Sequence, residues 1–396
     1  MIFYGYKRSD GKVGIRNHVL LLPVSICASD VARKVHERVK GTITFHNHLG
    51  CSQSIFDQEC TIRTMAGLAA NPNVYATILI ALGCENCQLA LVEKAIRLRT
   101  NKPLISLSIQ ECGGMSKTIR QAARYADLFV KEAAKESKTV QALSDLIIGT
   151  ECGGSDPTSG IACNPLTGSV MNDFVDEGAT VVLSETTEFI GAQHLLQQRA
   201  RSEKVSRRIK EIVDRYLESQ AVIGYDIRQR NPSPGNKKGG ITTLEEKSLG
   251  CILKAGSRPI ENVFDYGEEL KPSGLVIMDT PGNDSTSMMG LAAGGCQLIV
   301  FTTGQGTPMG NPVVPVFKVC ANPKTCLTFS EHLDHDASPI ITGSESFEIQ
   351  KKKLKESMIE VINGSKTKSE QLDFYETSIA RVNKYVKDKK VYSYYY

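Results

Sequence analysis

The chain has 396 residues, 41% of them hydrophobic and 23% charged, which is typical of a folded globular protein and excludes disordered and collagen-like chains. Its 47 basic and 43 acidic residues leave a net charge of +4, too weak an excess for a nucleic-acid binder. No apolar run approaches the ~20 residues that a membrane span needs, and the first residues lack the layout of a signal peptide. The expected compartment is therefore the cytoplasm. The length exceeds the ~250–300 residues at which one core usually stops growing, which predicts two domains.

The first part of the chain alternates short apolar runs with helical patterns, which predicts βα units on a parallel sheet. The expected strands are residues 18–27, 41–45, 74–82 and 103–109, and the expected helices are residues 30–39, 57–70, 87–98 and 117–129. We therefore expect an α/β fold whose N-terminal domain, residues 1–140, has three layers around a parallel sheet. The charged stretch at 131–138 marks the predicted boundary.

Residues 141–396 predict a larger α/β catalytic domain. The expected strands are residues 146–149, 178–184, 274–278 and 297–301, and the expected amphipathic helix is residues 203–217. A segment rich in Gly, Pro and Asn at 224–250 is typical either of an ordered functional loop or of a disordered linker. The tail, 388–396, holds four tyrosines and is expected to pack on a neighbouring molecule.

Five of the 12 cysteines directly follow predicted buried strands. They are Cys27, Cys51, Cys84, Cys112 and Cys152. Ligand sites in open α/β sheets lie beyond the carboxyl ends of the strands, so we expect these five thiols at one rim. There they could bind a metal ion together with His46 or His48. The alternatives are that each thiol packs as a small hydrophobic residue, or that the CxxC at Cys84 is a redox pair.

Polar and glycine-rich segments also follow predicted strands. ECGG occurs at 111–114 and 151–154, and its second copy continues with Ser155, Asp156 and Ser159, which could contact a polyhydroxylated ligand. The alternative is a capped helix start. Arg16 lies in a run that suits carboxylate recognition or a solvated β-hairpin. The loop at 302–312 is of an anion-binding type but matches no nucleotide-binding motif.

Five segments in this order resemble the galactarate dehydratase/altronate dehydratase family, specifically its large catalytic part. They are residues 5–17 (GYKRSDGKVGIRN), 82–86 (LGCEN), 151–165 (ECGGSDPTSGIACNP), 231–250 (NPSPGNKKGGITTLEEKSLG) and 301–310 (FTTGQGTPMG). The resemblance implies removal of water from a sugar acid to give a 2-keto-3-deoxy acid, with a divalent metal, commonly Fe²⁺ or Mn²⁺. Because thiolates that converge on one point are also the ligands of iron–sulfur clusters, such a cluster is an alternative to the single ion.

The resemblance also implies a partner. Longer members carry a small SAF-type domain before the motif that starts here at Tyr4, so we expect a separate small subunit to supply it. Close relatives with such a subunit release sulfite from (2R)-sulfolactate to give pyruvate, which is the alternative activity. A non-catalytic sugar-acid-binding protein is a further alternative. We expect a homo-oligomer with a small anionic sugar acid as substrate, and neither nucleic acid nor membrane as a partner.

Elimination from a 2-hydroxy acid needs a base, an electrophile at the carboxylate and an acid at the leaving group. Each of these roles is assigned here to particular side chains. The predicted metal region is His48, Cys51, Cys84 and Cys152; the predicted substrate-binding residues are Arg16, Ser155, Ser159, Asn236, Thr302, Thr303 and Gly304; and the predicted catalytic residues are Lys247, His48 and Asp156. Lys247 or a histidine is the expected base.

Overall fold

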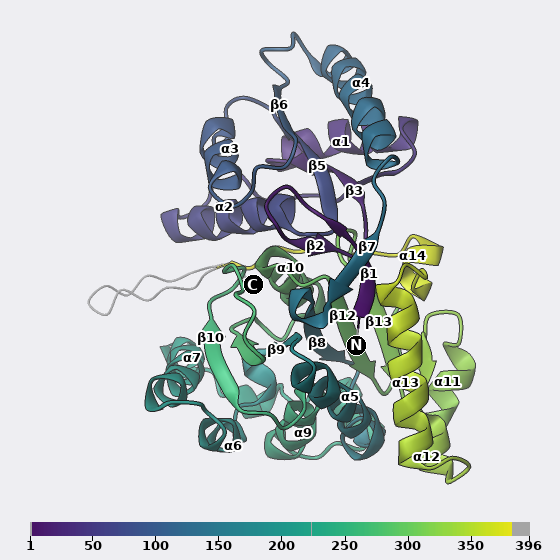
Figure 1. Ribbon diagram of the computed structural model, residues 1–396. Helices are drawn as coiled ribbons and strands as arrows, with labels where there is room; N and C mark the ends of the chain where they lie inside the picture. The colour runs from purple at the N-terminus through teal and green to yellow at the C-terminus, as the bar shows by residue number, and fades with distance from the viewer. Residues whose placement is uncertain (1, 223, 382–396) are drawn as a thin grey trace.

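A computed structural model describes residues 2–222 and 224–381 (Figure 1). Within these residues, no helix combines the length and the apolar character that a membrane crossing requires. The predicted packing of the tail at 388–396 lies outside the described residues. The chain forms two parallel sheets with helices, as the α/β prediction expects, and one small antiparallel sheet.

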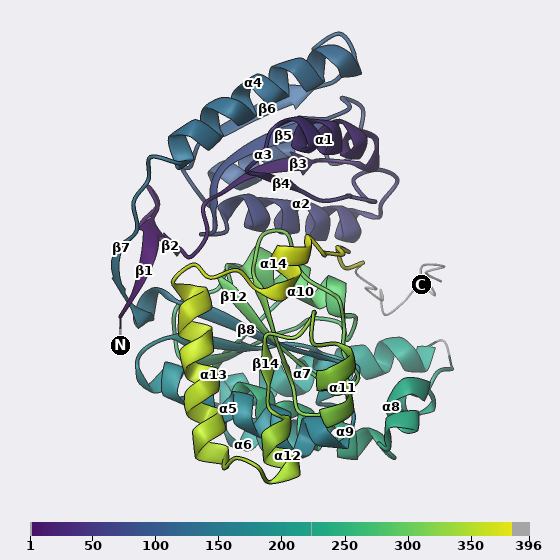
Figure 2. The same ribbon diagram turned by 90° about the vertical axis from the view of Figure 1, so that its right-hand side faces the viewer.

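The N-terminal sheet is parallel, with strand order β4-β3-β5-β6. Its strands are β3 (His18–Pro23), β4 (Thr42–Thr44), β5 (Val74–Ala81) and β6 (Leu104–Ser108). Its helices are α1 (Ile26–Arg38), α2 (Ile55–Ala70), α3 (Leu89–Arg97) and α4 (Met115–Ala133). Helices α1 and α4 cover one face, and α2 and α3 cover the other (Figure 2). This confirms the predicted three-layer arrangement.

The C-terminal sheet is parallel throughout, with strand order β10-β11-β9-β8-β12-β13-β14. Its strands are β8 (Ile147–Gly153), β9 (Thr180–Leu183), β10 (Ile260–Phe264), β11 (Leu275–Met278), β12 (Leu298–Thr303), β13 (Val316–Cys320) and β14 (His335–Asp336). The sequence predicted four of these strands and missed β10, β13 and β14. All three lie toward the edges of the sheet, where the apolar runs are short or interrupted.

Helices cover both faces of this sheet and its ends. They are α5 (Asn164–Asp176), α6 (Gln193–Gln198), α7 (Glu203–Val222), α8 (Pro234–Gly239), α9 (Leu244–Cys251), α10 (Asp284–Gly294), α11 (Pro323–Thr328), α12 (Ser338–Thr342), α13 (Phe347–Ile362) and α14 (Lys368–Leu372). Because 224–250 contains α8 and all of α9 except Cys251, this segment is an ordered part of the domain and not a disordered linker.

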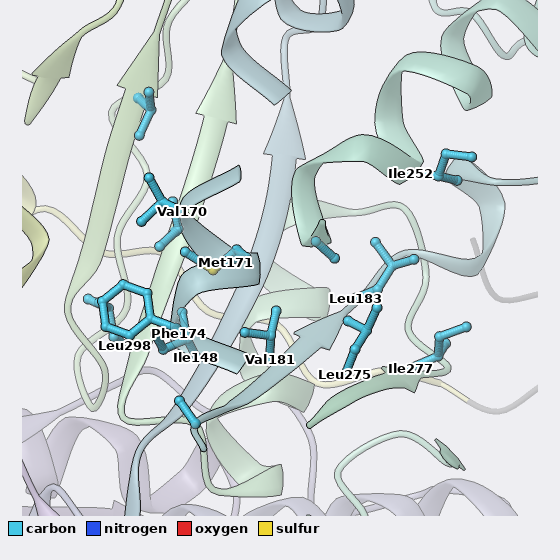
Figure 3. Packing of buried hydrophobic residues seen from close by; sticks show 14 of the residues in the cluster. Ile148, Val170, Met171, Phe174, Val181, Leu183, Ile252, Leu275, Ile277 and Leu298 are labelled. Atoms are coloured by element: carbon cyan, nitrogen blue, oxygen red, sulfur yellow. The ribbon is translucent and has the colours of Figure 1, made fainter. Parts of the chain in front are cut away.

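The core of the C-terminal domain forms where α5 packs on the centre of the sheet (Figure 3). Phe174 and Met171 are fully buried against Ile148 of β8 and Val181 of β9. Strands that are covered on both faces need apolar side chains on both sides, which explains why β9 and the first four residues of β12 are continuous apolar runs and not alternating ones.

A third sheet joins the two ends of the N-terminal region. It is antiparallel, in the order β2-β1-β7, with β1 (Ile2–Lys7), β2 (Val13–Gly14) and β7 (Thr139–Ala142). Strands β1 and β2 form the hairpin that the sequence allowed for the Arg16 segment. The predicted domain boundary at residue 140 falls inside β7.

The two parallel sheets are joined where α2 packs on α10 (Figure 2). The Asn71 amide donates hydrogen bonds to the carbonyls of Ala292 (2.7 Å) and Cys296 (2.9 Å). Asn73 donates to the carbonyl of Gln297 at 2.9 Å. Gly67 allows the close approach of the two helices, since a Cβ built there would lie 2.1 Å from the Ala293 carbonyl oxygen.

We predict that Gly67→Ala destabilises the protein. A glycine-to-alanine change inside a helix is normally favourable by about 0.5–1 kcal/mol. Here overpacking against the Ala293 carbonyl should reverse the sign and lower the free energy of unfolding by about 1–3 kcal/mol, measured by urea denaturation. Gly235→Ala is the matched control, because its Cβ would meet no atom closer than 3.7 Å. An unchanged midpoint for Gly67→Ala would contradict this account of the junction.

Candidate functional site

The carboxyl ends of β8 and β12 lie at the point where the strand order of the C-terminal sheet reverses. The chain leaves β8 toward β9 on one side and later returns to place β12 on the other. Such a reversal opens a crevice beyond the strands, where α/β proteins bind their ligands. The loops after β8 and β12 meet here, since the backbone N–H of Gln305 donates to the Gly154 carbonyl at 2.8 Å.

Several of the residues predicted from sequence line one cavity at this position, with a volume of about 300 Å³. Ser155, Asp156, Ser159 and Lys247 all contribute to its wall. The Asp156 carboxylate is held by the Thr158 hydroxyl at 2.6 Å and by the Asn322 amide at 2.7 Å. The structure thus brings the predicted motifs at 151–165 and 231–250 together at one cavity. It also fixes the orientation of the Asp156 carboxylate.

Other predicted substrate-binding residues support the loops of this cavity. The Asn236 amide in α8 donates to the Ser155 carbonyl at 2.9 Å. Thr302 and Thr303 are buried, and their hydroxyls bond the Glu151 carbonyl (3.3 Å) and the Gly306 N–H (3.0 Å), respectively. Gly304 lies so close to Asp156 that a Cβ would meet its carboxylate at 2.3 Å. In these contacts the four residues shape the loops around the cavity.

Lys247 forms a nearly buried ion pair with Glu188, with 2.7 Å between Nζ and Oε2. Lys247 also donates to the Asn231 amide oxygen at 3.1 Å. Burial alone would lower the pKa of Lys247, but the Glu188 carboxylate beside it raises that pKa above its ordinary value. Burial raises the pKa of Glu188. Lys247 is therefore protonated in the resting protein, and Glu188 is a more basic carboxylate than an exposed one.

A second cluster lies behind the cavity wall, and sequence reasoning missed most of it. Lys254 is fully buried in a 3₁₀ turn (Ile252–Ala255) after α9. Its Nζ donates to Glu185 Oε2 at 2.9 Å, to Cys251 Sγ at 2.9 Å and to Cys152 Sγ at 3.3 Å. The two sulfur atoms are 3.5 Å apart. Cys152 is thus buried beside a cation and another thiol.

The charges of this cluster follow from those contacts. The hydrogen bond from Cys152 and the nearby Lys254 lower the pKa of Cys251, whereas the same thiol contact and burial raise the pKa of Cys152. Against the effect of burial, the surrounding anions raise the pKa of Lys254. Lys254 likewise lowers the pKa of Glu185 despite burial. The cluster therefore holds one ammonium between a carboxylate and two cysteine sulfurs that contact each other.

Glu185 is held in a backbone conformation that non-glycine residues rarely adopt. Its φ is 63°, in the left-handed region, where strain of this kind often accompanies functional sites. Its N–H donates to the Thr280 hydroxyl at 2.7 Å, which helps fix this conformation. The strained turn places the Glu185 carboxylate at the end of β9, within reach of both Lys254 and Glu151.

A group of three carboxylates can hold a divalent metal ion. Ligand oxygens of Glu151, Glu185 and Asp284 lie within 4.8 Å of one another. Glu151 is fully buried; one of its oxygens accepts from the Ser184 hydroxyl at 2.7 Å, whereas Oε1 has no hydrogen-bond donor. Burial and the Glu185 charge raise the pKa of Glu151 well above its ordinary value. A hard divalent ion would satisfy the free oxygen and the excess negative charge, so this donor set fits Fe²⁺ or Mn²⁺.

The other predicted metal ligands lie on the N-terminal domain. His48, Cys51 and Cys84 are exposed on loops beyond the ends of that domain's strands. The Cys51 thiol contacts the Asn86 amide oxygen at 3.6 Å. The prediction that all five strand-end thiols share one rim is wrong, because Cys152 ends a strand of a different sheet. Among the described residues, the groups that could hold a metal ion include Cys152 but not the other three.

Arg16 has its partners within the chain. Its guanidinium forms a bidentate ion pair with Glu370, at 2.7 and 2.9 Å, and donates to the carbonyls of Val361 and Ser365. These contacts tie the β2 hairpin to the C-terminal helices. They account for the burial of Arg16 without a substrate, and its predicted role at the carboxylate stays a prediction.

A helical spacing could have revealed the second cluster. Lys247, Cys251 and Lys254 are four and three residues apart, which places them on one face of a helix. Glu151 lies in the last half of β8, and Glu185 comes two residues after the apolar strand β9. The sequence-based prediction considered thiols and histidines as metal ligands, and it missed these carboxylates and Lys254.

Comparison with known families extends this picture. The second domain of D-galactarate dehydratase/altronate hydrolase matches residues 5–134, and the C-terminal domain of D-galactarate/altronate dehydratase matches residues 143–385. The (2R)-sulfolactate sulfo-lyase subunit beta of Chromohalobacter salexigens is 36% identical over 96% of this chain and 97% of that protein. The altronate dehydratase of Bacillus subtilis is 37% identical over 95% of this chain and 77% of that protein.

A third relative is the galactarate dehydratase (L-threo-forming) of Escherichia coli, which is 32% identical over 92% of this chain and 73% of that protein. The names of all three relatives describe lyases, so the alternative of a non-catalytic binding protein has no support. The chain is a lyase, and it belongs to the D-galactarate/altronate dehydratase family.

Proposed function

We propose that this lyase removes water from a sugar acid of the altronate or galactarate type. The observation that carries the proposal is that the Ser155, Asp156 and Ser159 oxygens and the Lys247 ammonium lie on the wall of the same cavity. Hydroxyl and carboxylate side chains suit a polyhydroxylated ligand, and an ammonium suits its negative charge. All 12 cysteines are free, which agrees with an enzyme of the reducing cytoplasm.

The cavity would orient the substrate through groups that are already fixed. Because the Thr158 and Asn322 side chains hold the Asp156 carboxylate, substrate binding need not order it. Ser155 and Ser159 add two hydroxyls on the same wall. These three residues would form hydrogen bonds with the hydroxyl groups along the sugar-acid chain. Their number supports a sugar acid over a substrate with few hydroxyls.

Metal dependence is part of the proposal. Glu151, Glu185 and Asp284 would hold the ion. When bound, a divalent ion stabilises the negative charge that develops on the substrate carboxylate after the α-proton leaves. The buried Ser184 and Ser287 hydroxyls, at 2.7 and 2.6 Å from Glu151 Oε2, hold that side chain in place.

The Lys247–Glu188 pair can supply both proton transfers. Glu188, made more basic by burial, would accept the α-proton as the C–H bond breaks. The Lys247 ammonium would give its proton to the departing β-hydroxyl, which leaves as water. The proton on Glu188 can then return to Lys247 across their 2.7 Å contact, which restores the resting pair. In this scheme Lys247 acts as the acid, whereas the base expected from the sequence was Lys247 or a histidine.

Sulfite release from (2R)-sulfolactate is a second candidate activity. It is favoured by one observation, the match of this chain to 97% of the sulfo-lyase subunit beta. That protein is named as a subunit, which also supports our proposal of a separate small partner chain. Against this activity, sulfolactate has a single hydroxyl group for the three side-chain oxygens of Ser155, Asp156 and Ser159 on the cavity wall.

An activity assay tests the proposal directly. The chain, produced alone and together with a small-subunit candidate encoded beside it, is supplied anaerobically with Fe²⁺ or Mn²⁺ and given altronate, galactarate or sulfolactate. We expect a 2-keto-3-deoxy acid from a sugar acid, and a loss of that product when the metal is removed by chelation. Sulfite and pyruvate with no keto-deoxy acid would instead establish the second candidate.

We predict that Glu188→Gln separates the proton-transfer pair. The variant should lower kcat by about 10²–10⁴-fold, since it removes the proposed base. It should also lower the pKa of Lys247, because burial then acts without the neighbouring carboxylate; NMR of ¹³C-methylated lysines measures this change. The lost charged contact should lower the free energy of unfolding by about 1.5–3 kcal/mol.

Glu245→Gln is the matched control for this prediction. Glu245 lies nearby at the start of α9 and pairs with Arg228, but both side chains are about half exposed. Exposed pairs contribute about 0–1 kcal/mol, so its stability and kcat should stay close to those of the unaltered enzyme. Equal losses in the two variants would argue against a special role for Glu188.

A further inference from the structure

We infer that Lys254 is a metal-specificity residue, whose ammonium occupies a ready-made site for thiophilic metal ions and thereby keeps such ions away from the carboxylates. The inference deepens the proposed function and rests on it in one respect, that the elimination uses a divalent ion. It starts from the buried cluster of Lys254, Cys152, Cys251 and Glu185, which touches the cavity only through Cys251.

The three ligands of Lys254 form a metal-binding set in their own right. Ligand atoms of Cys152, Cys251 and Glu185 lie within 4.8 Å of one another, and all three residues are buried. Two thiolates and a carboxylate are donors that zinc and cobalt accept in proteins. The two sulfur atoms are 3.5 Å apart, close to the roughly 3.7 Å expected for sulfurs on a tetrahedral zinc ion with bonds of about 2.3 Å.

The Lys254 ammonium stands where such an ion would stand. Its Nζ is 2.9 Å from Cys251 Sγ and Glu185 Oε2, and 3.3 Å from Cys152 Sγ. A metal ion and a buried ammonium cannot share that position, because they would overlap and repel each other in a medium of low dielectric constant. Lys254 has no exposed surface and is held by three acceptors, so it cannot move aside into water.

Glu185 connects the two sites. It belongs both to the set around Lys254 and to the carboxylate set with Glu151 and Asp284. A thiophilic ion bound to the two cysteines would therefore also take Glu185 from the oxygen site. With Lys254 in place, the sulfur donors are engaged and the oxygen donors stay available for a hard ion such as Mn²⁺ or Fe²⁺.

The test removes the ammonium and uses Co²⁺ as a spectroscopic probe. Iodoacetamide first blocks the exposed thiols of Cys27, Cys51 and Cys84 in the folded, reduced protein. The unaltered chain and Lys254→Met are then titrated anaerobically with Co²⁺. We expect no sulfur-to-cobalt charge-transfer absorption from the unaltered chain. In Lys254→Met the band should appear and saturate at one equivalent, and it should be lost in Lys254→Met/Cys251→Ser.

Thermal unfolding gives a readout independent of the spectrum. Lys254→Met leaves buried anionic ligands without their cation, so it should be less stable than the unaltered protein. Added Zn²⁺ should raise the Tm of Lys254→Met and leave that of the unaltered protein unchanged, because only the variant binds the ion in its folded state. Lys254→Gln, which is neutral but keeps hydrogen-bond donors, serves as a second variant should the methionine variant fail to fold.

Two results would overturn the inference. One is a full charge-transfer band from the alkylated, unaltered protein, which would mean that the ammonium does not exclude the ion; this measurement needs no variant. The other is a folded Lys254→Met or Lys254→Gln protein that binds no Co²⁺ through sulfur. Neither readout depends on turnover, so a failed sugar-acid assay would leave the cobalt result standing, and a failed cobalt titration would leave the elimination intact.

Discussion

The contact between the Lys254 ammonium, Glu185 and two cysteine sulfurs is the interaction on which the rest of the site depends. A charge with no exposed surface costs several kcal/mol in desolvation unless it is fully paired, so this cluster exists only if the elements that carry it are held together. Those elements are β8, the turn after β9 and the turn after α9. Their packing brings Glu151 and Glu185 side by side, and it also forms one wall of the cavity.

The parallel sheet explains why so many charged groups converge here. The backbone of each strand is buried and paired along its length, so the chain can present polar side chains only where a strand ends. Glu151 and Thr302 lie near the carboxyl ends of β8 and β12, Glu185 follows β9, and these three adjacent strands end at the same edge. The reversal of strand order between β8 and β12 separates their loops and leaves the crevice that Asp156 and Lys247 line.

The sequence predicted the elements whose patterns are local. Continuous apolar runs identified β3, β5, β8 and β12, and glycine-rich motifs after β8 and β12 identified the loops that meet at the cavity. It could not place Cys152 correctly, because a thiol after an apolar run looks the same in either sheet. Arg16 is another such case: a guanidinium in a turn suits an external carboxylate, and in the structure it pairs with Glu370, 354 residues along the chain.

Lys247 and Lys254 show how a difference in burial can give identical side chains different roles. Lys247 lies in α9 and Lys254 in the 3₁₀ turn after it, and each pairs with a glutamate that follows β9. Lys247 keeps 12% of its side chain exposed at the cavity, so its proton can exchange with a bound substrate. Lys254 keeps none, and its proton has no route to solvent except through the groups that hold it. The same ammonium group therefore suits proton transfer in α9 and permanent charge neutralisation in the turn that follows it.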